Sequence, residues 1–186
     1  LQRYGEAVQH LEKVATEDDK YAQNAYYYLG DCYMRQGDKS RARAAFEMAS
    51  RSSHDSVLRE DALFTFAKLT YELRESPLSD AVDAFTRYLD EYPDSPRASE
   101  VYNYLGLAYA STKNYQKTLD VLQRISRPDA LTQQAIQRAA YFRGVELYQN
   151  LKYAEADSLF AVSLSVGAYV PELRASALYW RGEALF

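Results

Sequence analysis

One short pattern recurs along the whole chain at a fixed spacing. A glycine preceded by an aromatic residue two positions earlier stands at Gly30, Gly106, Gly144 and Gly182. The last three are 38 residues apart, and Gly30 precedes Gly106 by two such periods, with Ala67 near the middle. A repeat of this length indicates copies of one small unit stacked on their neighbours, not a single closed core.

Each copy has the pattern of two helices. Tyr26, Leu29 and Tyr33 are spaced as one buried helical face, and Ala42 and Phe46 repeat that spacing in the next segment. An alternation of period two never persists long enough to indicate a strand. The sequence therefore predicts about ten helices in antiparallel pairs.

Short polar or turn-forming segments separate the predicted helices. Gly37-Asp38, Lys113-Asn114 and Asn150-Leu151-Lys152 fall between the two halves of a copy. The run from Tyr92 to Pro96 ends one copy and starts the next, with Ser95 as the expected N-cap. Glycine or alanine is expected where two helices cross closely, with a large side chain of the partner helix filling the adjacent space.

The order aromatic-x-x-Leu-Gly-x-x-Tyr, then Gly-Asp, then Ala-x-x-x-Phe-x-x-Ala resembles the tetratricopeptide repeat, whose period is about 34 residues. The resemblance covers essentially the whole chain and implies an all-α, right-handed solenoid of antiparallel helix pairs. Thr118, Arg143 and Arg181 depart from the family pattern. The expected segments are a trailing half repeat over 1–19, full repeats over 20–56, 57–95, 96–130 and 131–170, and a leading half repeat over 171–186.

The residues that could support catalysis are few. His10 and His54 begin no metal-ligand spacing, and every glycine is isolated among helix residues, so no phosphate-binding loop is present. Cys32 stands alone, which excludes an internal disulfide, and its apolar helix favours a packed thiol over a nucleophile. We therefore expect no enzyme activity, no cofactor and no metal site.

The resemblance also implies an extended concave binding groove. In repeats of this family the groove positions lie six, three and two residues before the small residue, and one, four and five after it. Tyrosine suits such a surface because it combines a large apolar area with a polar tip, and the chain has 18 tyrosines. The expected groove residues are Tyr27, Tyr28, Asp31, Arg35, Phe64, Lys68, Tyr71, Tyr104, Tyr141, Tyr148, Tyr179 and Trp180. The same aromatic residues could instead pack between repeats.

Two functions remain open at this stage. The chain is either a protein-binding scaffold that holds a peptide or partner helix in its groove, or a structural spacer within a longer solenoid. A net charge of −4 argues against nucleic acid, and the longest uncharged run, 158–171, is too short to span a bilayer. The chain starts and stops inside apolar periodic segments, which indicates a longer parent and possible self-association through open repeat ends.

The compartment is unknown from the residues themselves. The turn from Tyr92 to Pro96, followed by Ala98 and Val101, is similar to turns in bacterial periplasmic members of the family. These members include outer-membrane assembly lipoproteins and cell-envelope coordination proteins. That similarity is the sole basis for expecting the protein in the bacterial periplasm or cell envelope.

Overall fold

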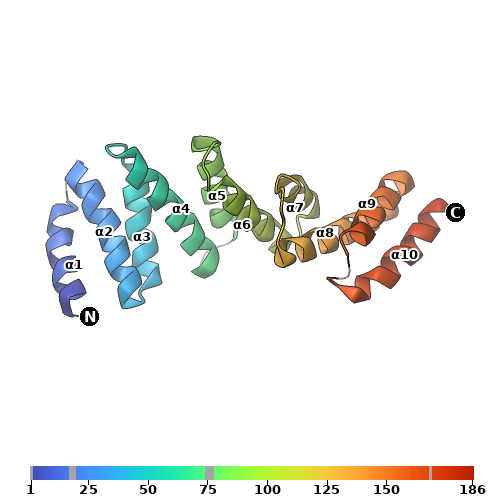
Figure 1. Ribbon diagram of the computed structural model, residues 1–186, viewed down its shortest axis with the longest axis horizontal. Helices are drawn as coiled ribbons and strands as arrows, with labels where there is room; N and C mark the ends of the chain where they lie inside the picture. The colour runs from blue at the N-terminus through green and yellow to red at the C-terminus, as the bar shows by residue number, and fades with distance from the viewer. Residues whose placement is uncertain (1, 17–19, 74–77, 168) are drawn as a thin grey trace. The chain divides into compact units, whose positions relative to one another are not determined.

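The computed structural model describes residues 2–16, 20–73, 78–167 and 169–186. These residues form ten α-helices and contain no strand, which confirms the predicted all-α class (Figure 1). The helices are α1 (Gln2–Val14), α2 (Lys20–Gln36), α3 (Lys39–Arg51), α4 (Ser56–Leu73), α5 (Leu78–Glu91), α6 (Ala98–Ser111), α7 (Tyr115–Leu122), α8 (Ala130–Gln149), α9 (Tyr153–Ser165) and α10 (Pro171–Leu185).

The even-numbered helices carry the recurring small residue and are called first helices below; the odd-numbered ones are called second helices. The chain divides into two compact units, an N-terminal unit, Leu1–Val101, and a C-terminal unit, Tyr102–Phe186. In the N-terminal unit α2 packs on α3 and α3 on α4, and in the C-terminal unit α8 packs on α9 and α9 on α10. The predicted boundaries of the individual repeats stay predictions.

Gly106 and Gly144, two of the small residues of the first helices, lie where a second helix presses against them, whereas nothing lies within 4 Å of a β-carbon built at Gly182. A β-carbon built at Gly144 would lie 2.7 Å from a ring carbon of Phe160, and one at Gly106 would collide with Leu122. Both large residues come from the second helix of the same pair and are fully buried or nearly so. The expected pairing of a small residue with a large partner is confirmed at these crossings.

The turns inside three pairs share one backbone device. Gly37, Lys113 and Leu151 have φ values of +80°, +59° and +61°, the left-handed region that reverses the chain at a helix end. The residue that follows stands at the N-cap of the second helix. In α3 this residue is Asp38, whose side chain accepts a hydrogen bond from the backbone N–H of Arg41. These breaks are the ones predicted from the sequence.

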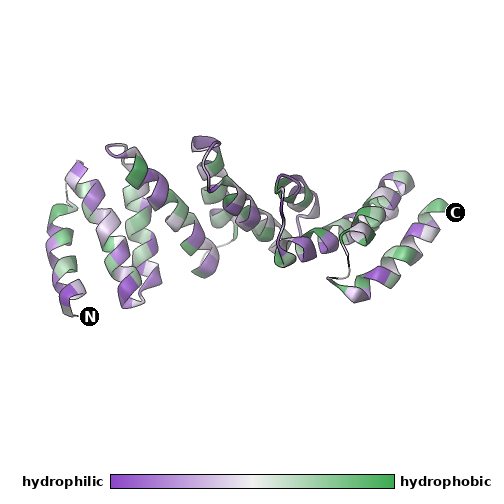
Figure 2. Cartoon of the chain, in the orientation of Figure 1, coloured by the Kyte–Doolittle hydropathy of each residue, from purple (hydrophilic) through white to green (hydrophobic). Residues whose placement is uncertain are grey.

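Each unit buries a row of apolar side chains between its helices. Phe46, Phe85 and Tyr88 are buried in the N-terminal unit, and Leu122 and Phe160 are buried in the C-terminal unit. Figure 2 shows hydrophobic and hydrophilic residues alternating along the helices, as expected where one side of a helix packs and another meets solvent.

The two arginines that replace the usual leucine keep their charges paired at the surface. The Nε of Arg143 donates a hydrogen bond of 3.2 Å to Gln116, and its Nη1 lies 3.0 Å from Glu146. The Nε of Arg181 lies 2.6 Å from Oδ1 of Asp157 on α9. Both guanidinium groups reach carboxylates of the same unit, so neither arginine leaves an unpaired charge within its helix pair.

Candidate functional site

Two adjacent tyrosines of α2 have different surroundings. The hydroxyl of Tyr27 donates a hydrogen bond of 2.5 Å to Oδ2 of Asp61 on α4, and its ring meets Phe46 edge-on at 5.6 Å between centroids. Burial, followed by the hydrogen bond to Asp61, raises the pKa of Tyr27 to about 12. Tyr28, in contrast, is 52% exposed. Tyr27 therefore links α2 to α4, whereas Tyr28 leaves much of its ring in solvent.

Arg97, in the turn before α6, is a residue of this surface that sequence reasoning missed. Its Nη1 lies 2.6 Å from Oδ1 of Asp61, and its guanidinium lies 4.8 Å from the ring centroid of Phe64. The Nζ of Lys68 lies 5.8 Å from the same centroid and 3.6 Å from Oε1 of Glu100. Phe64 and Lys68, both expected in a groove, thus contact charged partners of their own chain.

A pocket of about 330 Å³ opens beside this charged cluster. Its lining residues are Tyr27, Val57, Leu58, Glu60, Asp61, Pro96 and Arg97. Both carboxylate oxygens of Asp61 already accept a donor, one from Tyr27 and one from Arg97. The pocket therefore offers a ligand the apolar side chains of Val57 and Leu58, while the carboxylate of Asp61 is held by its own chain.

The remaining expected residues of the N-terminal unit also have partners. Asp31 and Arg35 form an ion pair of 3.0 Å on α2, and Nη1 of Arg35 lies 3.4 Å from the hydroxyl of Tyr4 on α1. An exposed pair of this kind contributes little to stability. The ring of Tyr71 lies 6.4 Å from that of Phe85, between α4 and α5.

Four aromatic side chains of the C-terminal unit, which we call the aromatic patch, form one continuous surface. They are Tyr148 on α8, Tyr153 on α9, and Tyr179 and Trp180 on α10. The ring centroid of Tyr148 is 5.0 Å from that of Trp180 and 5.1 Å from that of Tyr153, and Trp180 is 5.4 Å from Tyr179. Tyr179 is 60% exposed. The structure therefore brings three expected groove residues together and adds Tyr153.

The other two expected residues of this unit are half-buried. The ring of Tyr141 on α8 lies 6.1 Å from Phe160 of α9 and 5.2 Å from Phe142. Phe142 in turn stacks on Tyr115 of α7 at 5.2 Å, with 21° between the ring planes. Tyr141 thus contributes to packing inside its helix pair. Tyr104 lies half-buried on α6.

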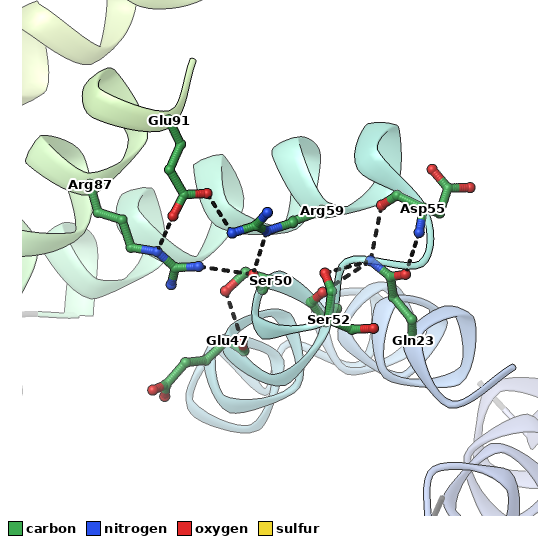
Figure 3. Close-up of polar contacts among 9 residues, drawn as sticks. Gln23, Glu47, Ser50, Ser52, Asp55, Arg59, Arg87 and Glu91 are labelled. Carbon is green, nitrogen blue, oxygen red and sulfur yellow. Dashed lines mark hydrogen bonds and ion pairs between the residues drawn. The ribbon is translucent and has the colours of Figure 1, made fainter. Parts of the chain in front are cut away.

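A buried glutamine fixes the turn between α3 and α4 (Figure 3). The Nε2 of Gln23 donates to the carbonyl oxygens of Ala49, Ser52 and Asp55 at 3.0 to 3.3 Å. Its Oε1 accepts the backbone N–H of Asp55 at 2.7 Å. One side chain of α2 therefore satisfies backbone groups at the end of one helix and the start of the next.

Gln137 has the same task in the C-terminal unit. Its Nε2 donates to the carbonyl oxygen of Gly167 at 3.0 Å, and its Oε1 accepts the backbone N–H of Val170 at 2.8 Å. Both glutamines stand seven residues before the glycine of their helix. That shared offset is a signal in the sequence that could have identified them.

Two arginines converge on one backbone carbonyl next to the first of these turns (Figure 3). The Nε of Arg59 and the Nη2 of Arg87 both donate to the carbonyl oxygen of Ser50, at 3.3 and 3.0 Å. Glu91 lies 2.8 Å from each guanidinium and balances their charge. The arrangement ties α3, α4 and α5 together and has the character of a structural joint.

The residues with potential chemistry lie apart from one another. His10 and His54 are exposed on different segments, and burial raises the pKa of the Cys32 thiol, which disfavours the reactive thiolate. Among the described residues no three potential metal ligands gather at one point. In that same part of the chain, none of the helices combines the length and the apolar character needed to span a bilayer.

Comparisons with known proteins follow the repeat. Residues 1–63 and residues 66–131 each match a family model described as a tetratricopeptide repeat. The solved structure of MamA protein is 18% identical, with a TM-score of 0.52 over 88% of this chain and 86% of that one. This likeness concerns the fold alone. No protein of curated function matches the chain in sequence.

A second solved structure is the C-terminal part of a TPR repeat-containing protein from Cytophaga hutchinsonii. It is 18% identical over 98% of the present chain, with a TM-score of 0.47. The present chain spans 65% of that structure's length.

Proposed function

Because the chain belongs to the tetratricopeptide-repeat family, we propose that it is a non-catalytic scaffold that binds a protein partner through exposed aromatic residues of its first helices. Tetratricopeptide repeats generally mediate protein–protein interaction and are typically non-catalytic. Stacked helix pairs present extended surfaces on which a peptide or a partner helix can lie.

The exposure of two tyrosines carries this proposal. Tyr28 on α2 and Tyr179 on α10 leave 52% and 60% of their surface in solvent, and both lie at groove positions of the family pattern. Tyrosine gives a large contact area at a low cost in side-chain entropy and is enriched among the residues that dominate protein interfaces. An exposed tyrosine beside other rings is therefore a favourable contact for a partner.

The spacer function is favoured for another part of the chain. Tyr27, Asp61 and Arg97 form a closed set of hydrogen bonds and ion pairs, and Phe64 already carries Arg97 over its ring. Groups that satisfy one another have less to offer an external ligand. We propose that this face of α4 holds neighbouring repeats together, whereas Tyr28 in the N-terminal unit and the aromatic patch in the C-terminal unit each offer a contact surface for a partner.

Selection of peptides from a random display library tests the scaffold proposal for a partner of any sequence. The immobilised chain is compared with a double variant, Tyr28→Ser with Tyr179→Ser. The matched control is Met48→Ser with Val162→Ser, which removes comparably exposed apolar side chains from second helices. Circular dichroism verifies that all three proteins fold.

The expected result is a set of enriched peptides that bind the parent chain and the control but lose at least tenfold in affinity on the tyrosine variant. Peptides that bind all three proteins equally would contradict the proposal. So would a selection that enriches nothing above the empty support.

Two further expectations depend on the sequence alone. Self-association through exposed helix faces is tested by sedimentation at two protein concentrations, where a mass independent of concentration would reject it. A bacterial cell-envelope location rests on the resemblance of the turn from Tyr92 to Pro96 to periplasmic members of the family.

A further inference from the structure

Several aromatic rings of this chain are covered by a cation of the same chain. The distances from the charged group to the ring centroid are 4.7 Å for Arg41 over Tyr33, 4.8 Å for Arg97 over Phe64, 5.3 Å for Lys117 over Tyr109 and 5.6 Å for Arg124 over Tyr102. A cation over an aromatic face is attracted by the negative charge density of the ring.

The aromatic patch differs from these rings. Among the described residues no lysine or arginine lies over Tyr148, Tyr179 or Trp180. The two cations adjacent in sequence to patch residues are paired elsewhere: Lys152 lies 3.2 Å from Glu155, and Arg181 lies 2.6 Å from Asp157. Within the described ranges, therefore, the rings of this surface have no cation of their own over them, and the two nearest in sequence are held by carboxylates.

A carboxylate lies beside the patch and has no ion-pair partner within the described part of the chain. Glu183 is exposed on α10, at the groove position directly after Gly182. Glu183 follows Trp180 by three residues and Tyr179 by four on the same helix, a spacing that places the carboxylate on the helix face that carries these two rings. Rings and a free carboxylate on one surface are complementary to a cation.

The packing of the rings selects the shape of that cation. The three centroid distances of 5.0 to 5.4 Å are contact distances, so each of these rings packs against a neighbour, and Tyr179 keeps 60% of its surface in solvent. A flat guanidinium can lie on an exposed ring face while its N–H groups point to a carboxylate. Arginine is the side chain that combines both contacts.

We propose that the aromatic patch and Glu183 bind the guanidinium group of an arginine in the partner segment. This inference rests on the proposed scaffold function and specifies the chemistry of its partner. The partner segment is basic at this point, with its arginine stacked on Tyr179 and Trp180 and paired with Glu183.

Trp180 is the only tryptophan of the chain, so its fluorescence reports binding at the patch directly. The probe is the capped peptide Gly-Arg-Gly-Arg-Gly, titrated at low ionic strength. The comparison peptides carry citrulline, which is neutral and nearly isosteric, or lysine in place of each arginine. The arginine peptide is expected to change the Trp180 fluorescence in a saturable way. The lysine peptide is expected to bind with a weaker affinity, and the citrulline peptide is expected to cause no change in fluorescence.

Two variants test the residues named. Glu183→Gln removes the charge with little change in shape, and Tyr179→Ala removes an exposed ring. Each is expected to weaken the affinity for the arginine peptide about twofold to fivefold, the range for an exposed cation contact. Glu172→Gln, an exposed carboxylate in the first turn of the same helix, is the matched control and is expected to leave the affinity unchanged.

The proposal is overturned if the citrulline or lysine peptide binds as tightly as the arginine peptide, or if Glu183→Gln and Glu172→Gln behave alike. Its failure can be distinguished from failure of the scaffold proposal. Library peptides that depend on Tyr28 and Tyr179 but contain no arginine would uphold the scaffold and reject this inference.

Discussion

The ring of Phe46 occupies the space in which a side chain of Gly30 would lie. A β-carbon built on Gly30 comes within 2.8 Å of ring atoms of Phe46, closer than carbon atoms of different residues approach. The glycine is on α2 and the ring on α3, so the distance between the two helices is set by this contact. Helix propensity alone would favour alanine at a helical position, and the packing of the pair opposes it.

Gly30→Ala is therefore expected to destabilise the protein, by about 1–3 kcal/mol, because an added methyl group must displace a buried ring. Gly5→Ala is the matched control, since nothing lies within 4 Å of a β-carbon there. It should stabilise α1 by about 0.5–1 kcal/mol through the lower backbone entropy of alanine. Urea denaturation of both variants measures the two changes, and equal signs would contradict this account.

The fold could be predicted because its determinants recur at fixed offsets. Gly30 and Phe46 are 16 residues apart, and the pairs Gly106 with Leu122 and Gly144 with Phe160 have the same spacing. The breaks between the helices of a pair could be predicted as well, because the segments that contain Gly37, Lys113 and Leu151 interrupt the helical pattern. Local patterns of this kind depend on neighbours along the chain and not on distant contacts.

The candidate site could be predicted only in part. The groove offsets place Tyr27 and Tyr28 on one helix face. Their surroundings nevertheless differ, because the hydroxyl of Tyr27 binds Asp61 and Tyr28, the next residue, is largely exposed to solvent. Arg97 could not be found, because it lies in a turn whose path decides where its long side chain reaches. The clustering of Tyr153 with the patch likewise depends on how α9 packs against α8.

The buried amide of Gln23 supports a second prediction. Gln23→Leu leaves the backbone N–H of Asp55 and three carbonyl groups without this partner, and each unsatisfied buried polar group costs about 1–3 kcal/mol. The free energy of unfolding of this variant is expected to fall by about 2 kcal/mol or more, as measured by thermal or urea denaturation. Gln9→Leu, on the exposed side of α1, should change stability by less than about 0.5 kcal/mol.

A third prediction concerns alkaline pH. The pKa of Tyr27 is raised to about 12, so the folded state holds this proton more tightly than the unfolded chain, where tyrosine has a pKa of about 10. The stability contributed by Tyr27 is complete below pH 10 (about the unfolded value) and is lost as the pH rises through 12.

Tyr27→Phe should cost about 1.5 kcal/mol at neutral pH, the usual value for a hydrogen bond to a charged group. Its deficit relative to the parent should shrink between pH 10 and 12, in the window given by the raised pKa. Tyr28→Phe, which removes an exposed hydroxyl from the neighbouring residue, should match the parent at every pH. A deficit of Tyr27→Phe that does not change with pH would reject the role of Asp61.

The start of α8 gives a fourth prediction, at acidic pH. Asp129 accepts the side-chain hydroxyl of Thr132 at 2.6 Å and its backbone N–H at 2.7 Å, and these two bonds lower its pKa. A lowered pKa means stability that is present above the unfolded value of about 3.9 and is lost as the pH falls through the folded value.

Asp129→Ala should therefore lower the free energy of unfolding by about 1 kcal/mol at pH 7, the usual contribution of an N-cap, and by less than this at pH 3. Urea denaturation at the two pH values measures the difference. Asp90→Ala, which removes an exposed carboxylate within α5, should not lower stability at either pH. A loss for Asp129→Ala that grows on acidification would contradict the capping role.

Gln23 of α2, whose side chain binds the turn between α3 and α4, also has a mechanical consequence. Its amide binds backbone groups on both sides of the turn, so tension along the chain would pass through a side chain as well as through the main chain. Extension at this point therefore has to break the side-chain bonds of Gln23 as well as unwind the helix ends. Gln137 bridges Gly167 and Val170 in the same manner, so each of these two turns has a side-chain connection that runs parallel to its main chain.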